Sequence, residues 1–412
     1  MEPAAKEGIG TLLRNRRYVL YLVSRVALMI AMQMLAVAVG WQVYEITHQA
    51  LALGFSGLAL FLPAFVLALP GGHVADRLDR RWILLVCHFG SASCAATLAI
   101  LAYEKVHHLF PIYAVLCMLG TIRAFSGAAG QAFMPSLVEK HQLGRAVAFA
   151  SSCWQMAIIA GPSLGGMIYA VAGAAAPVYA VCAVLASVAV IAMFAIGKPP
   201  QPIEAKKRDP ASLATLLAGI RYVWADKPIL GSISLDLFAV LLGGAVALLP
   251  IYARDILRIG PWGLGLLRTA PAMGALLVAL VLAWFPLKRR AGVMMLLSVL
   301  VFGIATIGFG FAREFPFALA MLLVLGGADM ISVVVRSTLV QVRTPDEMRG
   351  RVSAVNMVFV GASNELGEFE SGVTAAWLGP ERAVIVGGVG TCIVVVLWAI
   401  LFPALRKIDR LD

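Results

Sequence analysis

Long apolar stretches separated by short polar segments dominate the chain. Twelve of them reach roughly 20 residues, the length that an α-helix needs to cross the hydrocarbon of a bilayer. They cover residues 18–43, 51–74, 82–102, 109–137, 147–171, 176–197, 229–252, 263–286, 291–311, 315–341, 352–378 and 383–405. They are too long and too uniformly apolar for the alternating strands of a membrane barrel. The pattern predicts an all-α membrane protein with twelve transmembrane helices.

The composition supports this prediction. Hydrophobic residues make up 61% of the chain and charged residues 13%, whereas soluble domains carry about 25% charged residues. All six cysteines lie inside the predicted spans, without CxxC or Cys/His ligand spacing, so we expect neither a metal nor another cofactor. No pairing of nucleophile and base is evident at either membrane face, and an enzyme is therefore not expected.

The basic residues predict the orientation. Most of the 33 Lys and Arg residues fall in alternate loops, and the loops of the other set hold only Lys105, Arg254, Arg258, Arg313 and Arg382. Cytoplasmic loops carry the excess of Lys and Arg, which places both termini in the cytoplasm. The net charge of +11 reflects this bias and gives no reason to expect nucleic acid as a partner.

An internal repeat divides the chain. A polar, basic linker, 198–228, separates a first six-helix lobe, 1–197, from a second, 229–412, and includes a candidate amphipathic helix at 212–224. In one gapless register, 119–125 lies over 325–331, 143–148 over 349–354 and 160–166 over 366–372. Two pseudo-symmetric lobes are typical of transporters whose substrate and ion sites lie between the repeats near the bilayer midplane.

The repeat places opposite charges at equivalent positions. Arg123 lies over Asp329, and a five-residue shift in the linker places Arg25 over Asp236. An ionisable group inside a membrane costs at least ~2.5 kcal/mol and normally faces a wet cavity or a partner. We therefore expect a passage with one basic and one acidic wall.

Three further carboxylates lie in the stretch GASNELGEFESGV, 361–373: Glu365, Glu368 and Glu370. Glu368 lies over Pro162 in the repeat. Buried carboxylates hold protons more readily than exposed ones, so Asp236, Asp329, Glu365 and Glu368 are candidates for coupling transport to protons. Two alternatives compete, namely fixed ion pairs with Arg336, Arg268 or the first-lobe arginines, and direct contact with a cationic cargo.

The candidate substrate-binding residues are Arg25, Arg123, Trp154 and Glu370. Arg25 lies near the inner end of its span, where its side chain could also extend to the membrane surface. Arg123 lies mid-span and cannot easily do so. Trp154 could equally pack in the core, Glu370 could pair with another span, and Arg336 is expected to anchor its span at the cytoplasmic side.

Three motifs resemble those of the major facilitator superfamily. GGHVADRLDRRWIL, 71–84, carries its loop signature at Gly72, Asp76, Arg77, Arg80 and Arg81, with Asp79 where the family usually has glycine. The fourth-span pattern is matched by Arg123 and Gly127, and the fifth-span pattern by Gly161, Pro162, Gly165 and Gly166. The phrases VGWQVYEIT, 39–47, and VQVRTPDEMRGRV, 340–352, resemble the branch of enterobactin exporters and macrolide-efflux-like proteins.

The resemblance implies roles for these motifs. Asp76 and the loop arginines would latch the lobes when the cytoplasmic side is closed, although orienting charge alone is the alternative. A carboxylate at this loop can also cap a helix. The fifth-span motif, typical of proton-driven exporters, would let that helix bend and approach a neighbour, although a plain seam of small residues is the alternative.

The sequence as a whole leads to one functional expectation. It predicts a monomeric, proton-coupled exporter (an antiporter) in a bacterial inner membrane, whose partners are protons, the lipid bilayer and a small organic molecule such as a siderophore or drug. Arg25 and Arg123 favour an anionic or catechol-like cargo, whereas the second-lobe acids favour cationic or macrolide drugs. A lipid or lysolipid translocator on the same fold is a further alternative. A membrane sensor would need a soluble signalling domain, and the longest loop is only the linker.

Overall fold

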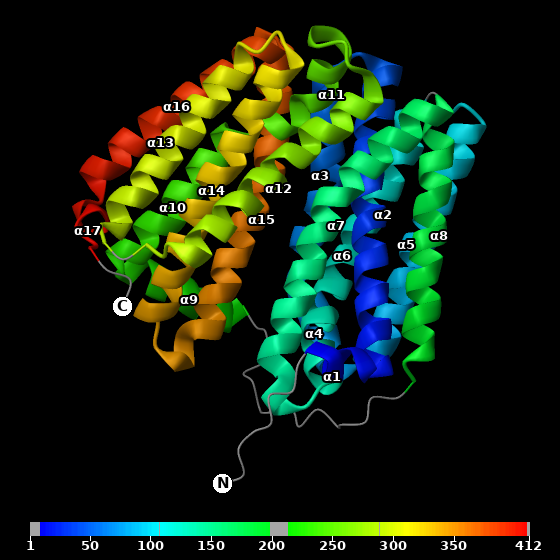
Figure 1. Ribbon diagram of the computed structural model, residues 1–412, viewed down its shortest axis with the longest axis horizontal. Coiled ribbons are helices and arrows are strands. Elements are labelled where there is room, and N and C mark those ends of the chain that lie inside the picture. The colour runs from blue at the N-terminus through cyan, green and yellow to red at the C-terminus, as the bar shows by residue number, and fades with distance from the viewer. Residues whose placement is uncertain (1–8, 107, 198–212, 288, 410–412) are drawn as a thin grey trace. The chain divides into compact units, whose positions relative to one another are not determined.

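The computed structural model describes residues 9–106, 108–197, 213–287 and 289–409, and over these residues it contains helices and no strand (Figure 1). Ten helices within this part are long and apolar enough to cross a membrane. The other two predicted spans fall on α3 with α4 and on α15, as set out below. The prediction of an all-α membrane fold is confirmed.

The helices follow the predicted spans closely. Their bounds are α1 Ile9–Arg14, α2 Arg16–Thr47, α3 Ala50–Val66, α4 Ala68–Arg77, α5 Arg80–Tyr103, α6 Leu109–Phe133, α7 Leu143–Ala172, α8 Ala175–Ala195, α9 Leu213–Ala225, α10 Lys227–Leu242, α11 Leu249–Ile251, α12 Gly260–Trp284, α13 Ala291–Gly310, α14 Phe315–Arg343, α15 Asp346–Leu378, α16 Pro380–Leu401 and α17 Pro403–Arg406. Short 3₁₀ turns cover Met134–Ser136, Lys140–Gln142 and Ala245–Leu248, and a π-turn covers Tyr252–Ile256. The helix expected in the linker is present as α9.

Three predicted spans deviate from a single apolar helix. The seventh, 229–252, is divided into α10, which ends at Leu242, the 3₁₀ turn Ala245–Leu248 and α11. The second is divided at Leu67 into α3 and α4, with Pro63 one turn before the break; proline removes a backbone hydrogen bond and disturbs the preceding turn. The eleventh is a continuous helix, α15, of 33 residues. It carries more charge than an ordinary span because the glutamates of the 361–373 stretch lie within it.

The described chain forms two compact units. One takes residues up to Ala38 and Leu62–Ala211, and the other takes Val39–Phe61 and Ser212–Asp412. The division falls within α2 and α3 as well as near the linker. The lobe boundaries at 197 and 229 remain a prediction.

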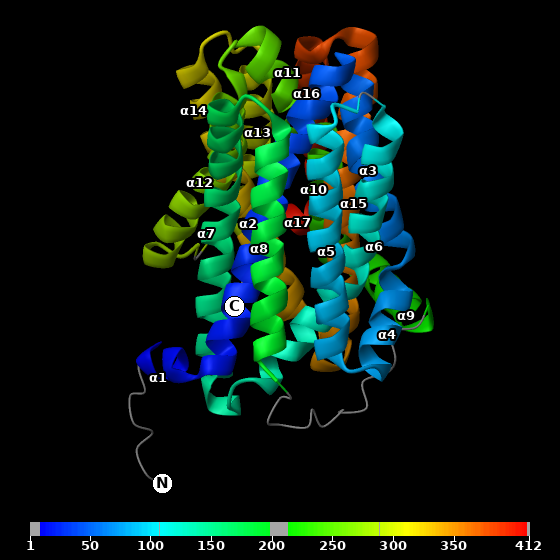
Figure 2. The ribbon, with the colours of Figure 1, turned by 90° about the vertical axis from the view of Figure 1, so that its right-hand side faces the viewer.

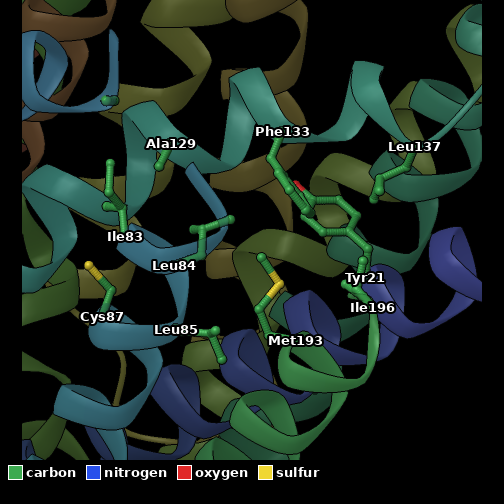
Figure 3. Close-up of a cluster of buried hydrophobic side chains, with 11 residues drawn as sticks. Tyr21, Ile83, Leu84, Leu85, Cys87, Ala129, Phe133, Leu137, Met193 and Ile196 are labelled. Carbon is green, nitrogen blue, oxygen red and sulfur yellow. The ribbon is translucent and has the colours of Figure 1, made fainter. Parts of the chain in front are cut away.

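In the first unit, α5 packs between α6 and α8 (Figures 1 and 2). Apolar side chains of α2, α5, α6 and α8 meet in a buried cluster, with the ring of Phe133 against that of Tyr21 (Figure 3). Met193 fills the cluster from α8. These contacts fix α2 and α6 next to each other, which positions the basic site described below.

In the second unit, α14 packs against α12 and α13, and α10 against α15 and α16. The N-terminal part of α3 belongs to this unit and runs close to α15. A Cβ atom added at Gly372 would lie 2.9 Å from Cα of Gly54, so only glycine permits this approach. The ring of Phe55 contacts that of Phe369 in the same seam.

Equivalent residues cap the first long helix of each repeat. Asn15 accepts a hydrogen bond from the Tyr18 N–H at 3.3 Å and donates to the Leu137 carbonyl at 2.8 Å. In the other unit, Asp226 accepts from the Ile229 N–H and from Nε of Arg343, both at 3.1 Å. The sequence register that pairs Arg25 with Asp236 also pairs Asn15 with Asp226. Each unit therefore ties the start of its first helix to the end of its fourth.

Candidate functional site

A buried ion pair joins α10 to α14. Arg336 Nη1 lies 2.5 Å from Asp236 Oδ2, and only 4% of Asp236 and 5% of Arg336 is exposed. The expectation that Arg336 anchors its span at the membrane surface is wrong, because its guanidinium is enclosed by the unit and paired. Removing one member of such a pair leaves an uncompensated buried charge.

Asp329 and Ser332 lie on the same face of α14 as Arg336, at spacings of three and four residues. Asp329 and Ser332 line a cavity of about 10 Å³ together with Asp236 and four apolar residues, Ala239, Val240, Val299 and Phe302. Asp329 is partly exposed, whereas Ser332 is buried and its Oγ has no hydrogen-bond partner in the described chain. The structure thus brings two of the four predicted coupling acids together, with a serine that the sequence did not indicate.

The other predicted acids lie elsewhere on α15. A Cβ atom added at Gly57 of α3 would lie 2.9 Å from Oε2 of Glu368, so Glu368 rests in the glycine seam between α3 and α15. Glu370 accepts a hydrogen bond from Thr374 Oγ1 at 2.7 Å. Neither these two residues nor Glu365 line the small cavity.

In the first unit, Arg25 of α2 lies beside α6 and α7. Its guanidinium carbon is 4.7 Å from the ring centroid of Trp154, a cation–π contact worth about 0.5–2 kcal/mol. A Cβ atom added at Gly130 would lie 2.8 Å from Arg25 Nη1, and Tyr21 Oη donates to the Gly130 carbonyl at 2.8 Å. The glycine provides the space that the guanidinium fills.

The two charged sites are related by the internal repeat. In the register that pairs Arg123 with Asp329, Gly130 falls over Arg336, just as Arg25 falls over Asp236. Each unit thus places a guanidinium between its first and fourth long helices. The arginine belongs to the first of these helices in the first unit and to the fourth in the second unit. In the second unit a carboxylate faces it, whereas residues 16–38, 80–103, 109–133, 143–172 and 175–195 of the first contain no Asp or Glu.

Arg123 and Trp154 have different environments. Arg123 is exposed within its unit and has a polar or electrostatic contact there or elsewhere in the chain. Trp154 is partly buried beneath the Arg25 guanidinium. The structure therefore joins Arg25 with Trp154.

The last residues of the loop motif form the N-terminal end of helix α5. Asp79, and not Asp76, caps α5, because its Oδ1 accepts from the Arg81 N–H at 2.9 Å. Its φ of −62° needs no glycine, so the departure from the family pattern is accommodated. The side chain of Asp76 lies outside the described part of the structure.

The loop arginines bind backbone carbonyls and aromatic rings. Arg80 Nε donates to the Ala75 carbonyl at 3.3 Å, and Arg81 Nη2 donates to the Phe194 carbonyl at 2.9 Å. Arg77 is exposed, and Gly72 is partly buried in α4. These contacts tie the loop to α8 within the unit.

The fifth-span glycines bring α7 against α2. Added Cβ atoms would lie 2.5 Å from Gln33 Cβ at Gly161 and 2.9 Å from Met34 Cα at Gly165. Helix α7 continues without a break through Pro162, and Gly166 is buried. The close approach expected from the motif is present, and a bending role remains a prediction.

Among the described residues, no group of three or more His, Cys, Asp or Glu side chains could hold a metal ion. The two sites offer charge and hydrogen bonds. The guanidinium paired with Asp236, the guanidinium over Trp154, two carboxylates and a buried hydroxyl can bind anions and protons.

Comparisons with known proteins show the family and the fold of the chain. The chain is 26% identical over 381 residues to the enterobactin exporter EntS of Escherichia coli O1:K1 / APEC, covering 92% of this chain and 90% of that protein. A mutant structure of the nucleoside transporter NupG has a TM-score of 0.75 at 12% identity, covering 94% of this chain and all of that one. The human organic anion transporter MFSD10 has a TM-score of 0.65 at 15% identity, covering 93% and 99%. A profile described as Major Facilitator Superfamily matches residues 21–368, and the chain belongs to that family.

Proposed function

We propose that this protein is a proton-coupled exporter of an anionic, aromatic small molecule of the catechol siderophore kind. The observation that carries the proposal is the environment of Arg25. Its guanidinium lies in a membrane helix against the face of Trp154 and beside Gly130, and residues 16–38, 80–103, 109–133, 143–172 and 175–195 of its unit contain no carboxylate.

The energetics favour an anionic ligand at Arg25. A lone arginine in a membrane segment costs at least about 2.5–3.5 kcal/mol on insertion scales, and the Trp154 contact offsets only part of this. An anion that accepts two parallel N–H bonds from the guanidinium would offset the rest. An aromatic cargo would also stack on the indole.

The similarity to EntS supports export. EntS is an enterobactin exporter and aligns with nearly the whole chain. We extend the direction of transport and the siderophore class to this protein as a proposal. The bias of basic residues and the bacterial relative support a multi-pass protein of the inner membrane with both termini in the cytoplasm, acting as a monomer.

Proton coupling is assigned to Asp236 and Asp329. They lie on different helices and line the same small cavity, and the one arginine beside them, Arg336, pairs with Asp236. When both acids are ionised, one negative charge is therefore left uncompensated. Taking up or losing a proton there changes the charge that α10 and α14 must bury, which couples protonation to helix position. Glu365 and Glu368 stay candidates for a second group on α15.

Transport into inverted membrane vesicles tests the proposal. With an imposed pH gradient, we expect uptake of a catechol siderophore and no uptake of macrolides or cationic dyes. Arg25→Gln should reduce siderophore uptake tenfold or more, Arg25→Lys should retain part of it, and Arg14→Gln on the exposed surface of α1 should leave it unchanged. Uptake of cationic dyes that survives Arg25→Gln would support the multidrug alternative.

The lipid-translocator alternative has one observation in its favour. A groove of about 850 Å³ lies on the first unit between α4, α5 and α6, lined almost entirely by apolar side chains such as Val86, Met118 and Phe125. The groove contains neither Arg25 nor Trp154, and Asp79 is the one charged residue of its lining, so it offers an acyl chain a place to rest without a basic site for an anionic headgroup. Movement of a fluorescent lysolipid in the same vesicles would favour this alternative.

A further inference from the structure

The cavity beside Asp236 and Asp329 has features of a binding site in its own right. Its lining contains two carboxylates and the hydroxyl of Ser332, and this hydroxyl is buried without a hydrogen-bond partner in the described chain. A buried hydroxyl without a partner costs about 1–3 kcal/mol. The volume of about 10 Å³ is close to the smallest space that accommodates one water molecule.

We infer that this cavity holds a single water molecule and that the site stores one proton, carried by Asp329. This rests on the proposed proton coupling and specifies its ligand and its stoichiometry. The water accepts or donates a hydrogen bond at Ser332 Oγ and bridges the two carboxylates. When a hydronium ion delivers the proton, one of its O–H bonds breaks and leaves neutral water, while one Asp329 carboxylate oxygen gains an O–H bond and loses its negative charge.

Charge balance sets the number of protons. Asp236, Asp329 and Arg336 together carry a net charge of −1 when both acids are ionised, and burying an uncompensated charge is costly. Because Arg336 binds Asp236 at 2.5 Å, Asp236 stays ionised as its partner. A single proton on Asp329 then makes the site neutral. Asp329 is also the partly exposed acid, so it is the one that a proton can reach.

The surrounding helices do not alter this balance. Helix α13 faces the cavity with Val299 and Phe302 and contains no ionisable residue. On α12 the one ionisable residue, Arg268, lies near Gly40. The three central acids of α15, Glu365, Glu368 and Glu370, do not line the cavity. On α16, Cys392 lies near Gly303 of α13 and does not line the cavity either. No further charge of the described chain enters the cavity.

A metal cation fits the site less well. Hard cations such as Ca²⁺ and Mg²⁺ take six or more oxygen ligands. Here only three residues of the lining, Asp236, Asp329 and Ser332, bear side-chain oxygen, and one oxygen of Asp236 is already bound to Arg336. The other lining residues are apolar.

Infrared difference spectroscopy of the purified full-length protein tests the inference. The band of protonated carboxylic acids is recorded between acidic and alkaline buffer and calibrated to the number of protons per chain. We expect the wild type to take up one proton more than Asp329→Asn, and this difference is the count for the site. Asp236→Asn should also remove this proton, because Arg336 then pairs with Asp329, whereas Arg336→Gln should double the count.

Ser332→Ala tests the water separately. The proton count should stay at one while the frequency of the band shifts, because the hydroxyl that orients the water is gone. Ser298→Ala is the matched control, since the Ser298 hydroxyl donates to the Met295 carbonyl at 2.8 Å and is absent from the cavity lining; it should leave the band unshifted. If Arg336→Gln does not fold, Asp236→Asn still decides the charge argument.

Several outcomes would overturn the inference. They are a proton count that does not fall in Asp329→Asn, a fall of two protons in that variant, an unshifted band in Ser332→Ala, and loss of the Asp329 band when sodium replaces choline at constant pH. The spectroscopic result does not depend on transport. If the site holds one proton but the vesicles show no transport driven by a pH gradient, the proposed function is refuted and the inference stands. If a pH gradient drives export but the site holds two protons, the inference is refuted and the proposed function stands.

Discussion

Removing the arginine of the Asp236–Arg336 pair should destabilise the second unit strongly. Arg336→Met keeps the length and the apolar stem of the side chain but leaves the Asp236 carboxylate, 4% exposed, without its cation. Breaking a buried pair by removal of one partner costs about 3–5 kcal/mol. Helix α10 packs more extensively against α15, and α14 more extensively against α13, than α10 and α14 pack against each other. The ion pair is therefore a main link between α10 and α14, and we expect a loss in the upper part of this range.

The double variant Asp236→Asn/Arg336→Met should recover much of that loss. It removes the uncompensated charge, and replacing a buried pair as a whole is often close to neutral. The coupling between the two substitutions should therefore reach about 1–3 kcal/mol, the upper part of the range for groups in direct contact. The free energy of unfolding is measured by reversible unfolding in mixed detergent micelles.

The exposed pair Arg313–Glu381 provides the matched control. Its two N–O distances are 2.7 Å, as short as those of strong charged hydrogen bonds, and Glu381 raises the pKa of Arg313. Its side chains are largely exposed, so water replaces the partner and Arg313→Met should cause only a small change. Equal losses for Arg313→Met and Arg336→Met, or a double variant no more stable than Arg336→Met, would refute the argument from burial.

Three further predictions concern helix contacts and the cargo site. Gly165→Leu should cost at least about 1–3 kcal/mol by overpacking against the backbone of Met34, whereas Gly144→Leu, with no atom within 4 Å of the added Cβ, should be nearly neutral in the same unfolding measurement. Asp226→Ala removes the cap of α10 and should cost about 0.5–2 kcal/mol; hydrogen exchange should increase in the first turn of α10 and stay unchanged at the start of α2. Gly130→Val should displace the Arg25 guanidinium and weaken binding of a catechol siderophore by about 1.5–3 kcal/mol in isothermal titration, while the protonated-carboxyl band of Asp329 stays unchanged.

The fold followed from the sequence because its determinants are local. A helix that spans a bilayer needs only sufficient length and apolarity, and each predicted span met that condition without information about its neighbours. The repeat register was equally informative, since Asn15 and Asp226 cap equivalent helices. Helix α15 was predicted as a span by the same criterion, despite its three central glutamates.

The site was predicted only in part, because partners depend on how helices are rotated about their axes. Asp236 and Asp329 were identified as buried ionisable residues, and an ion pair with Arg336 was one of the alternatives, but the sequence did not show which acid and which arginine would pair. The spacing of Asp329, Ser332 and Arg336 on one face of α14 was a usable signal for that group. The position of Glu368 against Gly57 depends on a contact between α3 and α15. These two helices lie far apart in the sequence, and no local pattern of residues indicates the contact.

The glycine at position 130 has an evolutionary consequence. Both halves descend from a common ancestor on the evidence of their register, and each keeps a positive group at the same depth although the two halves encode it on different helices. In the second half an acid on the facing helix neutralises that group, whereas in the first half Gly130 leaves room for the guanidinium of Arg25. Under the proposed function, a larger residue at position 130 would fill this space, so one substitution there would change which compounds the protein exports and leave the Asp236–Arg336 pair as it is.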